Sequence, residues 1–167
     1  GYVARERSGP TADQIATDPA FERTRENGQE FGRAGKAGKV LRNAIRSLIQ
    51  NAADSKAVSR LTKEMMKVVK ADVTNIRGLR NVIDGETELL EGFDFNINAK
   101  LGTTLFALYT VTIDRTTGAI TLNVPAFTPA NMVAAPAGST HFKIVSAGSE
   151  IDFEQEVHTT DVHESAI

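Results

Sequence analysis

The spacing of apolar residues changes once along this 167-residue chain, and the change limits the folds it can adopt. From Leu41 to Leu79, apolar residues recur every three or four positions, which is the period of an amphipathic helix. From about Glu91 onward they alternate with polar residues, as in Phe93–Ile97 and Ile120–Val124, which is the period of a half-buried strand. Helices followed by strands indicate the α+β class.

The first half of the chain predicts three basic helices, at about 19–30, 37–53 and 55–80. Asp18-Pro19 favours the first helix start, because Asp caps free amides and Pro fits the first turn. A glycine inside a helix costs about 1 kcal/mol relative to alanine. We therefore expect a tight passage between the first two helices at the closely spaced glycines, namely Gly28, Gly32, Gly35 and Gly38.

The second half predicts an antiparallel β-sandwich of five or more strands. Arg115–Gly118 is expected to form a hairpin turn, and Ala147–Ser149 a second turn. Tyr2–Ala4 is expected to be the end of a strand. The predicted organisation is a strand end and linker (1–18), a helical region (19–85), a β-sandwich region (86–158) and a tail (159–167) in one composite domain.

Charge is divided unevenly between the two halves. Residues 1–80 carry 16 Lys+Arg and 9 Asp+Glu, a net charge of +7, whereas residues 81–167 carry 3 and 12, a net charge of −9. The formal charge of −2 for the whole chain conceals this division. Two interpretations follow: the basic helices face the acidic half of the same molecule, or the positive end of one molecule meets the negative end of a neighbour.

No residue pattern predicts a catalytic, cofactor or metal site. The absence of Cys excludes disulfides and thiol chemistry. A phosphate-binding loop would need Gly where Arg33 stands and Ser or Thr in place of Val40. His158 and His163 are spaced poorly for metal binding. The longest apolar run, Leu105–Ile113, is too short to span a bilayer. We therefore expect no enzyme and no membrane insertion.

Two features instead suggest contact surfaces. Four carboxylates at steps of two would share one strand face, as a solvated face that discourages edge pairing or as a docking strip for a basic surface. The glycines at helical spacing allow close approach of another backbone, either within the chain or between subunits. The candidate assembly interface comprises Gly28, Gly32, Gly35, Gly38, Lys36, Lys39, Arg42, Arg46, Glu150, Asp152, Glu154 and Glu156.

These features predict a non-enzymatic structural protein that assembles head to tail with itself into a filament, tube or shell. Charge would orient the subunits, and apolar burial would hold them together. The alternative is a nucleic-acid-binding module that uses the basic helices, although few aromatic residues lie among their Lys and Arg residues. An assembly at the cell surface or outside the cell is slightly favoured over a cytoplasmic one.

Several segments together resemble a family of uncharacterised proteins from Bacteroidota. They are Asp18–Phe21, Thr24–Lys39 with its Arg-Glu-Asn-Gly and Gly-Lys-Ala-Gly-Lys runs, Arg80–Gly85, Ala137–Phe142, and Ser149–Phe153 with its Ser-Glu-Ile-Asp-Phe run. The resemblance covers most of the chain. It implies a further strand-like segment upstream of Gly1, and it implies no activity and no site residues.

Overall fold

The computed structural model describes residues 9–166, and it mixes helix and strand as the α+β prediction requires. The strand end expected at Tyr2–Ala4 lies outside the described residues. The elements in chain order are α1 (Ala12–Thr17), η1 (Pro19–Phe21), α2 (Glu22–Ala44), α3 (Arg46–Ile49), α4 (Ala57–Ala71), η2 (Thr87–Leu90), α5 (Leu101–Thr104), β1 (Thr110–Asp114), β2 (Ala119–Asn123), α6 (Pro129–Met132), β3 (Val145–Asp152) and β4 (Val157–Glu164).

A single helix, α2, passes through the glycine-rich segment, so the prediction of separate helices at 19–30 and 37–53 is wrong. Its buried stripe, which includes Ala34 and Ala37, packs against Leu61 and Met65 of α4. Packing of this kind supplies most of the stability of a helix in a protein. It therefore outweighs the unfavourable propensity of the glycines. The helical segment begins at Pro19, as predicted, because the Asp18 carboxylate accepts the Ala20 amide at 2.8 Å and caps η1, which leads into α2.

Helix α4 ends at Ala71 rather than near residue 80. The reason is Asp72, whose carboxylate accepts the amides of Thr74 and Asn75 at 2.8 and 2.9 Å and turns the chain out of the helix. The following loop returns to the two helices and adds Val82 to their core. Burial therefore centres on the α2–α4 pair and this loop.

The strands form two separate two-stranded antiparallel sheets, β1–β2 and β3–β4, so the predicted sandwich of five or more strands is wrong. Phe93 and Phe95 alternate as in a strand but belong to a loop, where their rings meet edge to face with centroids 4.9 Å apart. The loop backbone bonds to the start of α4 instead of to a strand. Arg60 donates to the carbonyl of Asp94 at 2.6 Å, and Asp54 accepts the amide of Ile97 at 2.8 Å.

One of the two predicted turns is confirmed. Residues 115–118 join β1 to β2, with Gly118 at a φ of 72°. The other prediction is wrong, because β3 runs straight through Ala147–Ser149. The chain reverses later, where the Asp152 carboxylate accepts the amides of Glu154 and Gln155. Residues 159–164, expected in a tail, consequently form most of β4.

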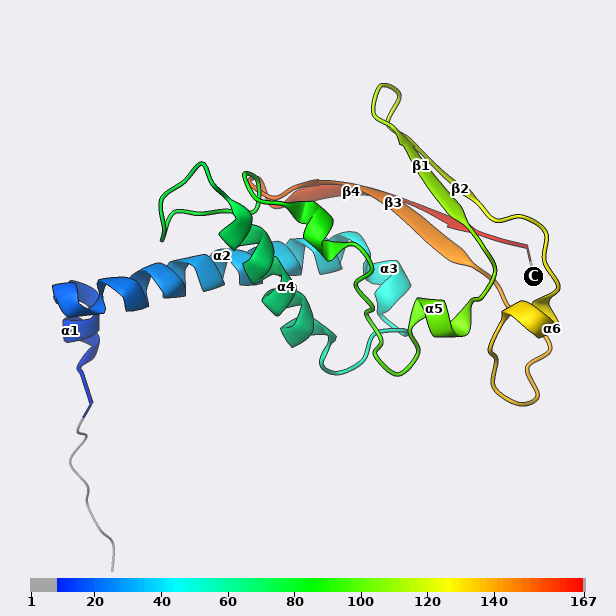
Figure 1. Cartoon of the computed structure of the whole chain (residues 1–167), viewed down its shortest axis with the longest axis horizontal. Helices are drawn as coiled ribbons and strands as arrows, with labels where there is room; N and C mark the ends of the chain where they lie inside the picture. Colours follow the sequence, from blue (N-terminus) through cyan, green and yellow to red (C-terminus); the bar gives the residue numbers. More distant parts are fainter. Residues whose placement is uncertain (1–8, 167) are drawn as a thin grey trace, which may run out of the picture.

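The molecule is elongated (Figure 1). Helix α2 lies along its long axis, and the β3–β4 hairpin packs beside the C-terminal part of α2. The β1–β2 hairpin lies beyond the C-terminal end of α2, beside β3, and projects away from the helical pair. No helix among residues 9–166 has both the length and the apolar character needed to cross a membrane.

Candidate assembly surfaces

Two of the segments quoted for the family resemblance meet in a polar clamp between α2 and the loop that follows α4. Glu30 of α2 is only 1% exposed, and its carboxylate lies 3.0 Å from the Arg80 guanidinium. The same carboxylate accepts the Gly78 amide at 2.9 Å. Arg33, one turn further along α2, donates to the carbonyl oxygens of Gly78 and Arg80. This clamp holds the loop on the helix, and sequence reasoning missed it.

A second polar cluster organises the same loop. Asp72 accepts hydrogen bonds from Asn75 and from the Asn81 amide at 3.0 Å, while Asp84 accepts the side-chain amides of Asn75 and Asn81 at 2.9 Å. Burial raises the pKa of Asp72, but the hydrogen bonds from Asn75, Asn81 and Thr74 outweigh it and lower the pKa to about 2. No group of three or more His, Asp or Glu residues within 9–166 is arranged to hold a metal ion.

The glycines of α2 divide between a buried face and an open face. Gly38 faces α4, where an added Cβ would lie 3.7 Å from Leu61, so its predicted place on an assembly interface is wrong. Gly28 and Gly32 have nothing within 4 Å of an added Cβ, and the same holds for Gly35. Phe31, on the same side of the helix, is exposed. The open face is therefore glycine-rich, with Phe31 exposed among the glycines.

Cations continue this open face toward the C-terminal end of α2. Lys39 follows Gly35 by four positions, and Arg42 follows Lys39 by three, which keeps them on one side of the helix. Within residues 9–166, neither these two nor Arg46 has a carboxylate within the 4.0 Å limit of an ion pair. Lys36 does, at 3.7 Å from Glu156 of the same chain. One pair expected between subunits therefore forms within a subunit.

The predicted ladder of four carboxylates on one strand is wrong. Glu150 and Asp152 lie in β3, whereas Glu154 and Glu156 lie in the turn, with Glu156 at a φ of 56°. The turn forms there because Asp152 caps its amides, so the strand cannot continue. The face of β4 that bears Thr160 packs on α2, since the Thr160 hydroxyl donates to the Ala44 carbonyl at 2.7 Å.

The opposite face of the β3–β4 hairpin points away from α2 and is acidic. Thr160 pairs with Ser149, so Glu150, the next residue along β3, lies on the other face. Asp161, the residue after Thr160, shares that outer face with Glu150. Both carboxylate residues are exposed. Of the four predicted acidic positions, Glu150 and Asp152 thus lie on this exposed outer face, two residues apart in β3, whereas Asp161 was not predicted.

The apolar and the polar side chains of the β1–β2 hairpin lie on opposite faces. Val111 pairs with Leu122, and Ile113 pairs with Ile120, so these four apolar residues share one face. Thr112 pairs with Thr121 on the other face. Within the part of the chain that the structure describes, this apolar face is only partly buried: Val111, Ile113 and Ile120 are 54%, 61% and 46% exposed.

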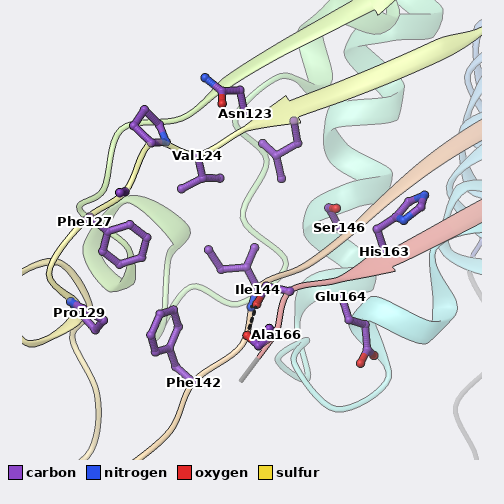
Figure 2. Close-up of a pocket in the computed structure, with 14 residues that line it drawn as sticks. Asn123, Val124, Phe127, Pro129, Phe142, Ile144, Ser146, His163, Glu164 and Ala166 are labelled. Atoms are coloured by element: carbon purple, nitrogen blue, oxygen red, sulfur yellow. Dashed lines mark hydrogen bonds between the residues drawn. The ribbon is translucent and has the colours of Figure 1, made fainter.

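An apolar groove continues from this face, with a volume of about 660 Å³ (Figure 2). It lies between the end of β2 and the start of β3. Its larger apolar lining residues include Leu122, Val124, Phe127, Phe142 and Ile144, and His163 and Glu164 also line it. Sequence reasoning missed the groove. The available signal was the lack of charge between Leu101 and Phe142, where Asp114 and Arg115 are the only Asp, Glu, Lys or Arg residues.

No protein-family model, curated protein or solved structure matches this chain. The resemblance to uncharacterised Bacteroidota proteins therefore stays a prediction. The arrangement itself offers glycine-rich, apolar and charged surfaces for macromolecular contact.

Proposed function

We propose that this protein is a non-enzymatic structural subunit that assembles with copies of itself. The observation that carries the proposal is the set of large apolar side chains that lie exposed among residues 9–166. A standard interface takes about 800 Å² from each partner.

Much of the exposed surface is apolar. Burial of apolar surface drives association, and large exposed apolar patches mark interaction sites. Exposed apolar side chains lie on α2, α4, β1 and β4, so each subunit offers more than one contact, which a filament, tube or shell requires. Large apolar side chains at least half exposed include Phe31, Val58, Val73, Ile76, Leu79, Ile83, Ile97, Leu101, Phe106, Leu108, Val111, Ile113 and Val157.

Charge supports an oriented contact between unlike surfaces. The open face of α2 presents Lys39 and Arg42, and the outer face of the β3–β4 hairpin presents Glu150 and Asp161. The Lys36–Glu156 pair is highly exposed and adds little to stability. Opposite potentials on two surfaces orient subunits head to tail, while apolar burial supplies most of the affinity.

The test is the mass of the purified protein by analytical ultracentrifugation over a wide range of concentration, together with electron microscopy of the concentrated sample. We expect the mass to rise with concentration and regular particles to form. A monomer mass at every concentration, at low and at high salt, would overturn the proposal.

A nucleic-acid-binding module is a second candidate, favoured by Lys39 and Arg42 on the open face of α2 and by Arg46 at the start of α3. Its test is fluorescence anisotropy with labelled single-stranded and duplex DNA and RNA. Binding that weakens steeply with salt, and is lost when the three cations are replaced by Glu, would favour this candidate.

A further inference from the structure

We infer that the apolar face of the β1–β2 hairpin, defined by Val111, Ile113, Ile120 and Leu122, is an interface that packs against the same face of a second copy of this chain. The inference rests on the self-assembly proposed above and adds to its head-to-tail contact a second contact, between like faces. It is independent of the charged surfaces of α2 and the β3–β4 hairpin.

The first support is the construction of the hairpin. The Asp114 carboxylate accepts the Thr116 amide at 2.9 Å and the Thr117 hydroxyl at 2.8 Å, and Gly118 closes the turn. These contacts hold a defined register that places every large apolar side chain of the two strands on one side. The hairpin is thus a preformed surface, which lowers the ordering cost of association.

The second support is that residues 9–166 cover this surface only in part. A two-stranded ribbon is marginally stable in water unless more strands or another apolar surface pack against it. Here only the β2 side is covered, where Ile120 approaches β3 so closely that an added Cβ on Gly148 would lie 2.9 Å from it. Val111 and Ile113 on β1 remain more than half exposed. The hairpin therefore requires a partner surface.

The third support identifies the partner as a second copy. The hairpin lies in a stretch from Leu101 to Phe142 in which only Asp114 and Arg115, at the turn, belong to the charged residue types. Interface cores are depleted in charge, and two identical uncharged faces meet without repulsion. A nucleic acid or a strongly charged protein would find no complementary charge on this face. A two-fold contact also uses the same patch on both subunits.

The test compares Ile113→Asp with Thr112→Asp, a matched control on the opposite face of the same strand. Sedimentation equilibrium measures the dissociation constant of each variant and of the unmodified protein, and circular dichroism with urea checks that each folds. We expect Ile113→Asp to weaken this contact by about a hundredfold, the effect of losing a central interface residue. We expect Thr112→Asp to leave it unchanged.

A second measurement uses the absence of Cys in the chain and needs no aspartate variant. Ile113→Cys and Thr112→Cys each introduce a single thiol, and its reaction rate with a thiol reagent is measured at rising protein concentration. We expect protection of the thiol at position 113 to grow with concentration, while the thiol at position 112 stays reactive.

The outcomes separate this inference from the proposed function. If the protein assembles but Ile113→Asp assembles equally and the thiol at 113 stays reactive, this inference is overturned while self-assembly stands. Equal losses in both aspartate variants would overturn the assignment to one face. A protein that is monomeric at every concentration would overturn both.

Discussion

At the scale of single residues, the loop after α4 depends on a few atoms. Gly78, at a φ of 86°, accepts a backbone conformation that side chains disfavour, and its amide reaches the buried Glu30 carboxylate. Gly85 lies against α4, where an added Cβ would stand 2.3 Å from the Val68 carbonyl oxygen. Together with Asp72, these residues hold the loop on the two helices.

We predict that Gly85→Ala destabilises the protein by about 2 kcal/mol, because the new methyl group must push the loop away from the backbone of α4. The measurement is the free energy of unfolding in urea. Gly102→Ala is the control, since nothing lies within 4 Å of an added Cβ there. Equal stability of the two variants would contradict the close approach at Gly85.

The Asp72 carboxylate predicts a dependence of stability on pH. Its pKa is lowered from 3.8 to about 2 in the folded protein, so the folded state favours the ionised form. Its contribution is complete above pH 3.8 and is lost as pH falls toward 2. We expect the urea midpoint to fall in that window by more in the unmodified protein than in Asp72→Asn. An identical slope in both proteins would contradict this role.

At the scale of elements, the two sides of α2 differ in role. The buried side stabilises the fold, and the open side does not. Its buried side carries Ala34, Ala37 and the clamp residue Glu30. Its open side carries three glycines that no contact within the described residues explains. The two sides therefore respond differently to substitution.

We predict that replacing Gly28, Gly32 and Gly35 by Ala raises the stability of the isolated subunit by about 1 kcal/mol per residue, because alanine is the better helix former and space is open. Thermal unfolding at low protein concentration measures this. If the glycines are kept for close approach of a neighbour, the same variant will assemble more weakly in sedimentation. If the variant is more stable and assembles as strongly as the unmodified protein, these glycines do not belong to the interface.

At the scale of the whole molecule, the two charged surfaces lie on different elements, the open face of α2 and the outer face of the β3–β4 hairpin. Salt screens such surfaces over about 10 Å at 0.1 M. It affects the rate of an oriented encounter more than the final affinity. In the proposed assembly, charge thus sets the rate and orientation of encounter, whereas apolar burial supplies the affinity, and the two contributions can be measured separately.

We predict that replacing Lys39 and Arg42 of α2, together with Arg46 of the adjoining α3, by Glu slows assembly at low salt, and that high salt removes the difference from the unmodified protein. The growth of light scattering with time, recorded in native buffer at the chosen salt concentration, measures the rate of assembly. A variant with Lys63, Lys67 and Lys70 of α4 replaced by Glu is the control, because the change in net charge is the same. Equal slowing in both variants would mean that net charge, rather than the α2 face, controls the rate.

The sequence by itself determined the features whose causes are local. The apolar stripe of α4 and the alternation in β1 and β2 were predicted, because side-chain direction follows the period of the backbone. The turn at Arg115–Gly118 was predicted from its glycine. The uneven division of charge between the two halves is also fixed by the sequence alone. These features located the candidate cations of α2 and part of the acidic surface.

The tertiary structure decided which surface covers which. Helix α2 continues through its glycines because α4 buries its opposite side, and Phe93 and Phe95 lie in a loop because their backbone finds partners at the start of α4. Apolar spacing reports that a face needs cover, but it does not report what provides it. For that reason only the fold revealed that residues 9–166 cover the apolar face of β1–β2 only in part and leave a groove beside it.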